Sequence, residues 1–239
     1  MRLWGLTRPD AVLLALLALA VAQPAPAAAP EQPAAASKPT AAQQPEQDSP
    51  EPVQVEGFRS ARWGMTEAQV KAAIQKDFNI PVDKERAEEN PSERTSVLSV
   101  TVNDLLEGAG KARISYTLGY TTKKLIQVDI IWGTTIDVQA KPERIVAAAN
   151  QLRTLFLNSG YDRETVISNL ATADGSIIVF RGQDADKHMT LLRLVSTPAS
   201  TAAKQRGKTE SAGPTVVLLL SYLLDPRNPD VYRLKKGQF

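Results

Sequence analysis

The chain has few side chains that could do chemistry, and they stand far apart along it. His188 is the only histidine, and none of the 239 residues is a cysteine. A Ser-His-Asp triad would therefore have to use His188, whereas His-rich metal sites, thiolate metal sites and cysteine nucleophiles are excluded. His188 begins an apolar run that alternates like a strand, which favours a half-buried structural role for this histidine.

Two carboxylates close to this histidine, Asp184 and Asp186, have the oxygen ligands that calcium prefers. The residues that follow them lack the glycine and the terminal glutamate of an EF-hand loop, so we interpret this stretch as a solvated turn. The prediction for the whole chain is therefore no catalytic residue, no metal site and no cofactor.

The segment from Gly108 to Lys111 resembles the end of a phosphate-binding loop. That motif requires a glycine five residues before its second glycine and a Ser or Thr after the lysine, and here Leu105 and Ala112 stand at those positions. We interpret the segment as a hairpin turn.

One long connection carries a cluster of basic residues. Segment 198–214 has 17 residues and contains Lys204, Arg206 and Lys208 against Glu210. Connections of this length are either functional or disordered, so these three basic residues are the candidate partner-binding residues.

A helix is predicted directly after the Trp-Gly-Met-Thr sequence at residues 63–66. Thr66 and Gln69 have the spacing of a capping box, and Pro81 prevents the helix from continuing. Between them, apolar residues recur with helical period: Val70, Ala73, Ile74 and Phe78. The motif is thus explained as a helix start, without a ligand.

Seven strand-like runs follow, in two groups separated by a second predicted helix from Pro142 to Ser159. The first group comes after a charged loop at 83–94 and covers 96–102, 112–120 and 125–132. The second group covers 165–171, 176–182, 188–196 and 215–224. Short polar or glycine-containing connections between the runs predict an antiparallel sheet.

Two strand patterns indicate how this sheet is buried. In run 112–120 apolar residues alternate with Arg113, Ser115 and Thr117, which is typical of a sheet with one covered face and one wet face. The unbroken apolar run from Val216 to Leu220 instead indicates a central strand, buried on both faces or lying at the join of two halves.

The N-terminal region predicts export. Residues 1–22 combine Arg2 and Arg8 with an apolar run of 12 residues and a small-x-small cleavage site at Ala20 to Ala22, as in a signal peptide. Residues 23–55 contain eight prolines and no aromatic residue, so we expect a disordered tether there, and a folded α+β domain over 56–239. The predicted location is the periplasm of a Gram-negative cell. The alternative is an inner-membrane tether facing the periplasm, with membrane contact only if the signal is not cleaved.

The order of elements suggests an internal duplication. Glu67, Val70, Ala72 and Ala73 match Glu143, Val146, Ala148 and Ala149 at an offset of 76 residues. Gly119 and Lys124 likewise match Gly182 and Lys187, each pair spanning a turn that leads into an apolar run. The fold prediction is therefore two helices packed on a largely antiparallel sheet, with a tandem αβββ repeat over 56–140 and 141–234 as its finer form.

The Trp-Gly-Met-Thr helix start, with Val70 opening the apolar stripe and an antiparallel sheet after it, resembles a pattern of exported bacterial domains of unknown function. It is more distantly similar to the small outer-membrane assembly factor BamE (SmpA/OmlA family) and to the tandem-repeat fold of the β-lactamase inhibitor protein. The resemblance implies helices packed on an antiparallel sheet. This chain lacks the lipidated cysteine of BamE and carries no inhibitory residues over from the inhibitor protein.

These observations favour a periplasmic, non-enzymatic binding module that acts in protein interaction or envelope assembly. The alternative is a carrier of a small apolar or lipid ligand in a sheet-lined cavity, and a third interpretation is a hydrolase that uses His188. Removing residues 1–22 leaves a net charge of about +1, so the chain lacks the concentrated basic excess of a nucleic-acid binder.

Overall fold

The computed structural model describes residues 50–80, 86–197, 215–234 and 237. The predicted signal peptide at 1–22 and most of the predicted tether lie outside these residues. Within the described part, no helix is both long enough and apolar enough to cross a bilayer.

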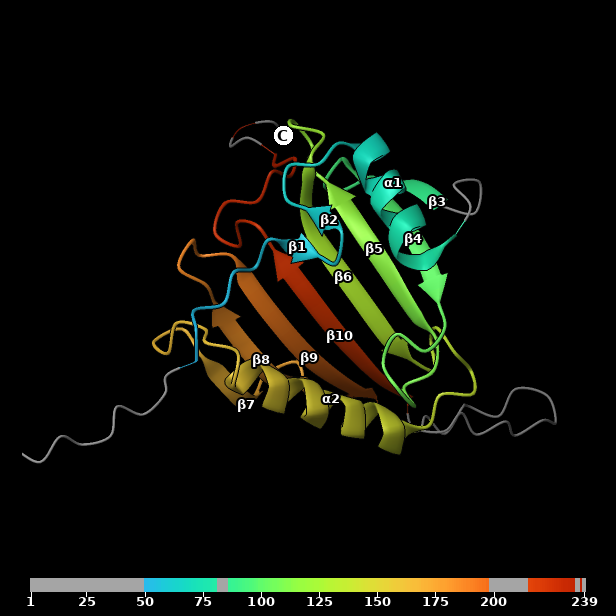
Figure 1. The fold of residues 1–239 in the computed structure, drawn as a ribbon, viewed down its shortest axis with the longest axis vertical. Coiled ribbons are helices and arrows are strands. Elements are labelled where there is room, and N and C mark those ends of the chain that lie inside the picture. The colour runs from blue at the N-terminus through green and yellow to red at the C-terminus, as the bar shows by residue number, and fades with distance from the viewer. Residues whose placement is uncertain (1–49, 81–85, 198–214, 235–236, 238–239) are drawn as a thin grey trace, which may run out of the picture. The chain divides into compact units, whose positions relative to one another are not determined.

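The described chain is an α+β structure with two helices, a small hairpin and a large antiparallel sheet (Figure 1). Helix α1 spans Glu67–Phe78 and helix α2 spans Pro142–Leu157. The hairpin consists of β1 (Gly57–Phe58) and β2 (Ala61–Arg62). The large sheet contains eight strands: β3 (Arg86–Asn90), β4 (Thr95–Val102), β5 (Ala112–Leu118), β6 (Leu125–Gly133), β7 (Ile167–Ala171), β8 (Ile177–Gln183), β9 (Met189–Thr197) and β10 (Thr215–Leu223).

The strand order in the large sheet is β3-β4-β5-β6-β10-β9-β8-β7, with every pair antiparallel. Each run of four strands is a simple meander, and the last strands of the two runs, β6 and β10, pair at the centre. The antiparallel prediction is confirmed. The predicted charged loop at 83–94 is wrong in part, because residues 86–90 form strand β3. This strand is at the edge of the sheet, where charged side chains remain in water and obscure the strand pattern.

One face of the sheet, which we call the inner face, is the floor of the hydrophobic core. A row of directly paired residues crosses six strands and is buried throughout: Val100, Ile114, Ile130, Leu220, Leu192 and Phe180. Both helices and the β1–β2 hairpin lie on this face, with the hairpin between the helices (Figure 1). The side chains of Phe58 and Tyr222 stack at a centroid distance of 5.9 Å and so attach the hairpin to β10.

The helix boundaries follow from local sequence. The Gln69 side chain accepts a hydrogen bond from the Thr66 amide at 2.9 Å, as a capping box requires. Asn79 ends α1 in a left-handed conformation, a role that asparagine tolerates better than most residues. Pro142 occupies the first turn of α2, where its missing N–H costs nothing.

The packed region begins earlier than the predicted boundary at Glu56. Val55 is buried, and the Val53 amide donates to the Gly160 carbonyl at 3.2 Å, just after α2. Residues 53–55 therefore belong to the fold rather than to the tether, because their valines have an apolar surface to cover.

The residue matches that suggested a repeat do not correspond in the structure. Val70 is buried, whereas its match Val146 is 40% exposed. Gly119 follows the third strand of the first meander, while Gly182 lies in β8, the second strand of the other. The two turns therefore join different strand pairs. Each helix is also followed by four described strands, so the predicted order of one helix and three strands is wrong.

Candidate binding surface

The second face of the sheet, which we call the outer face, is not covered by any helix or strand among the described residues. In the first four strands this face is mainly polar, with Val97 and Ile131 as apolar exceptions. Ser99, Ser115 and Asp129 are directly paired neighbours on it, and the Ser99 and Ser115 hydroxyls lie 3.0 Å apart. Thr101 and Arg113, one step further along the strands, are exposed. This half is the wet face that the alternation in 112–120 predicts.

In the last four strands the outer face is apolar. Pairing places Leu219 of β10 in one row with Ile178 and Leu170, and Leu191 and Val195 lie on the same face of β9. Leu170 is 47% exposed and Val195 is 36% exposed. We call this set the apolar patch: Leu170, Ile178, Leu191, Val195, Val217 and Leu219. Apolar side chains that gather on an open face are a signature of interaction surfaces.

The apolar patch explains the unbroken run in β10. Val216, Leu218 and Leu220 are buried on the inner face, whereas Val217 and Leu219 are only half-buried on the outer face. The predicted central position is confirmed, since β10 lies between β6 and β9. Burial on both faces is not observed, so the extra apolar residues are left on an open surface.

Two arginines stand among the residues of the apolar patch. Arg193 lies beside Leu219, and Arg181 lies beside Leu191 in the neighbouring row. The Arg193 guanidinium donates to the Asp174 carboxylate at 2.8 Å and to the Ser176 hydroxyl at 2.9 Å. No ion pair of Arg181 or Arg113 is found within the described residues.

Asp129 is the carboxylate at the centre of the outer face. The Ser221 hydroxyl donates to it at 2.5 Å and the Gln127 side-chain amide at 2.7 Å. Burial raises the pKa of Asp129 above its ordinary value, although these two hydrogen bonds oppose the shift, and the nearby charge of Glu93 adds to it. The protein therefore favours the protonated, uncharged form of this group more than water does.

Replacing Asp129 with asparagine should therefore make the protein more stable at neutral pH. Because the folded pKa is raised, the contribution of Asp129 to stability is fully present below its unfolded pKa and is lost as pH rises through the folded pKa. Urea unfolding of both proteins at pH 7 and near pH 4 checks this, with the exposed Asp186→Asn change as the control. A gain that grows as pH falls would contradict the assignment.

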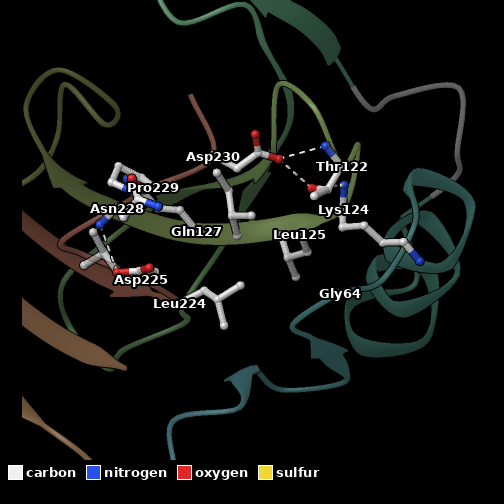
Figure 2. Close-up of a pocket in the computed structure, with 12 residues that line it drawn as sticks. Gly64, Thr122, Lys124, Leu125, Gln127, Leu224, Asp225, Asn228, Pro229 and Asp230 are labelled. Carbon is white, nitrogen blue, oxygen red and sulfur yellow. Dashed lines mark hydrogen bonds between the residues drawn. The ribbon is translucent and has the colours of Figure 1, made fainter. Parts of the chain in front are cut away.

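A cavity of about 360 Å³ lies at the end of the sheet where β6 begins and β10 ends. Its walls are mostly apolar and include Leu125, Ile126, Leu223, Leu224 and Pro229. Figure 2 shows that the Leu125 and Leu224 side chains project to the same side of the β6 ribbon. The volume is at the lower end of the range for small-molecule sites.

The polar groups around this cavity are mainly used within the protein. Figure 2 shows two hydrogen bonds between Asp230 and Thr122, which measure 2.8 Å to the amide and 2.7 Å to the hydroxyl. The Thr121 amide also donates to Asp230, at 3.0 Å. These bonds hold the pKa of Asp230 below its usual range, against the effect of burial. The Asp225 side chain accepts from the Arg227 and Asn228 amides. The carboxylates of the cavity wall are thus bonded within the chain, where they stabilise a turn, and are not free to bind a ligand.

His188 and Asp184 come together as a structural clamp. The buried Asp184 carboxylate accepts hydrogen bonds from the Val55 amide at 2.8 Å, the His188 amide at 2.9 Å and the His188 Nδ1 at 3.0 Å. Trp63 packs against the His188 ring at a centroid distance of 6.2 Å, and its indole N–H donates to the Val55 carbonyl at 2.5 Å. The clamp therefore attaches the chain before α1 to the β8–β9 turn.

The clamp also bears on the calcium and hydrolase interpretations. Oxygen or nitrogen atoms of Asp184, Asp186 and His188 lie within 4.8 Å of one another, which is close enough for a metal ion. Both Asp184 oxygens, however, already accept hydrogen bonds from the protein. His188 is oriented by Asp184, but among the described contacts no serine hydroxyl bonds to its ring.

The Gly108–Lys111 segment connects β4 to β5 as a turn. The Lys111 amide donates to the Asp137 carboxylate at 3.1 Å, and the Gln139 amide donates to it at 3.0 Å. These backbone bonds, first that from Lys111, lower the pKa of Asp137. A carboxylate of the chain itself therefore occupies an amide that a phosphate would need.

The predicted partner-binding residues Lys204, Arg206 and Lys208 lie outside the described residues. Sequence reasoning placed Arg113 on the wet face but missed Arg181, Arg193 and Asp129, because the partners of a strand residue on neighbouring strands depend on register. The available signal was the β10 run, whose apolar length exceeds what one buried face requires.

Comparisons with protein-family models, with curated proteins and with solved structures gave no match to this chain. The resemblances to BamE and to the β-lactamase inhibitor protein therefore remain predictions. Function has to be inferred from the geometry of the chain itself.

Proposed function

We propose that this chain is an exported, non-enzymatic binding module that holds a protein partner on the outer face of its sheet. The observation that carries the proposal is the apolar patch on that face. The inner face is covered by two helices and a hairpin, whereas Leu170 and Val195 of the outer face remain substantially exposed. A partner that covered this patch would remove apolar area from water, the main favourable term in protein association.

The edges of the sheet offer less to a partner than its face does. The edge strand β7 has five residues, and Asn169 within it adopts a left-handed conformation with φ 54°. The other edge strand, β3, is equally short and carries Glu88 and Glu89. Short, irregular or charged edges discourage the addition of another strand. The face is therefore the better candidate for the interface.

The export part of the proposal rests on residues 1–22. They carry the signal-peptide pattern, and in the periplasm a cysteine-free domain depends on its core alone. The finer fold proposal is a tandem αββββ repeat, supported by two helix-plus-meander units whose last strands pair at the centre. The buried helix positions correspond at an offset of 75, as Val70 does to Ile145. Relatives whose halves align at another register would contradict the repeat.

Site-specific photocrosslinking in the native cell tests the binding module. A photoreactive phenylalanine derivative at Leu219 should give a protein adduct of defined mass, because this position is central in the apolar patch. The same derivative at Gln151, exposed on α2, is the control and should give none. Absence of any protein adduct from Leu219 would count decisively against an interface there.

A second candidate function is the carriage of a small apolar ligand in the cavity of Figure 2. The specific observation in its favour is a mostly apolar wall around about 360 Å³. Native mass spectrometry of freshly purified protein would then show bound mass. That mass should be lost in a Leu224→Phe variant, which fills the cavity. Identical spectra with no bound mass would remove this candidate.

The hydrolase interpretation is the weakest, since Asp184 and Trp63 give His188 a structural role. A His188→Ala variant that folds and keeps every measured activity would dispose of it.

A further inference from the structure

The geometry points to the chemistry of the partner: we propose that it presents carboxylate side chains around an apolar centre and docks on the apolar patch of the outer face. This inference rests on the proposed binding function and deepens it. It follows from where the arginines stand relative to the patch.

The register places basic side chains on two sides of the apolar centre. One row across the sheet runs Arg113, Ile131, Leu219, Arg193, Ile178 and Leu170. Neighbouring strands are about 4.8 Å apart, so Arg113 lies roughly 10 Å from Leu219 on the side of β5. Arg193 lies on the opposite side of Leu219, next to it. In this row each arginine is therefore followed by two apolar side chains.

The adjacent row carries one arginine, Arg181, and continues past Ser221 to Asp129. Arg181 pairs with Leu191, which pairs with Ser221 of β10. Arg181 and Arg193 thus stand on two adjoining strands, Arg181 beside Leu191 and Arg193 between Leu219 and Ile178. Guanidinium groups bind carboxylates through paired, parallel hydrogen bonds and lose less hydration than ammonium groups do, which suits them to a buried interface.

The acidic groups described near this face form no ion pair with Arg113 or Arg181. Asp174 lies outside the strands, and its one ion pair among the described residues is with Arg193. The Asp129 carboxylate accepts hydrogen bonds from Ser221 and Gln127 of the chain itself. Glu88 stands on β3, at the far edge of the polar half. Arg113 and Arg181 therefore remain without an ion-pair partner in the described chain, and a carboxylate would complement them.

The same charges disfavour a second copy of the chain as the occupant. A symmetric dimer brings the same patch of both copies together, so the arginines of both copies would gather at one interface. Like charges that approach without a counter-charge are unfavourable at an interface. An acidic partner avoids this repulsion. The arginines would also attract it from a distance, which raises the rate of association.

Two synthetic amphipathic peptides with the same leucine positions provide the test. One carries glutamate and the other lysine at every polar position, and their binding to the purified protein is measured by fluorescence anisotropy at low and high salt. The glutamate peptide should bind at least about tenfold more tightly than the lysine peptide, and added salt should reduce the difference.

Charge reversal locates the interaction. Arg181→Glu should abolish or invert the preference, whereas Arg163→Glu, an equal change at an exposed position before β7, should leave it intact. Arg113→Glu, also at an exposed position, serves as a second variant if Arg181→Glu does not fold. Equal binding of the two peptides, absence of binding, or a preference that is unchanged in both reversal variants would overturn the inference.

The outcome separates this inference from the proposed function. If Leu219 gives a protein adduct in cells while the peptides show no charge preference, the binding module stands and the acidic partner is rejected. If Leu219 gives no adduct, the binding module itself is rejected.

Discussion

Replacing Asp184 with alanine should lower the free energy of unfolding by roughly 2–5 kcal/mol. The carboxylate is only 2% exposed and accepts hydrogen bonds from Val55 and twice from His188. Alanine would leave these donors buried without an acceptor, which costs more than the bonds contribute when formed. Urea denaturation, followed by the tryptophan fluorescence of the protein, measures the loss directly.

Asp186 provides the matched control, because it is an exposed aspartate in the same turn. Asp186→Ala should change stability by less than about 0.5 kcal/mol, as surface substitutions usually do. The pair also distinguishes a structural clamp from a metal site. If added calcium or zinc raised the melting temperature of the wild type and not of Asp186→Ala, the cluster would hold a metal and the clamp account would be incomplete.

Replacing Gly133 with alanine should be comparably damaging, at roughly 3 kcal/mol or more. Gly133 ends β6 at φ 128°, a conformation that other residues rarely adopt, and it pairs with Val217 at the centre of the sheet. A β-carbon at this position would overlap the Val216 carbonyl oxygen. Since the obstacle is backbone in the β6–β10 ladder, the two meanders would have to shift relative to each other.

Gly175→Ala is the control for backbone strain alone. Gly175 also has a positive φ, 79°, but a β-carbon there would meet nothing within 4 Å. This variant should lose only about 1–2 kcal/mol, the cost of a left-handed conformation. Thermal unfolding of both variants compares the two effects. Equal losses would show that the close approach of β6 and β10 contributes nothing.

Local sequence signals predicted the elements well. The Thr66–Gln69 pair and Pro142 gave the starts of both helices, and alternation in residues 112–118 gave the covered and wet faces of β5. These features depend on neighbours within a few residues. Strand β3 escaped prediction because an edge strand needs no apolar face and reads like a charged loop.

Features that depend on distant pairing could not be predicted. The clamp joins Val55 to Asp184 across 129 positions, and nothing in the turn sequence indicates that the carboxylate is buried. The cluster of Leu219, Arg193 and Arg181 exists only because β10 pairs with β9 and β9 with β8 in one register. A register shifted by one residue would move these side chains to the other face.

The residue matches between the two helices show that sequence identity without burial is not enough to align them. Val70 and Val146 are identical residues, yet one faces the core and the other faces solvent. Alanine-rich helices allow several registers, and only the pattern of burial selects among them.

The most direct test of the central claim is photocrosslinking from Leu219 in two further backgrounds. Val195 on the outer face and Val146 on α2 are both valines, at 36% and 40% exposure, so replacing each with glutamate is the same chemical change on different faces. We predict that Val195→Glu abolishes the Leu219 protein adduct while Val146→Glu leaves its yield unchanged. An adduct that survives Val195→Glu and is lost in Val146→Glu would place the interface on the helical side and contradict the account.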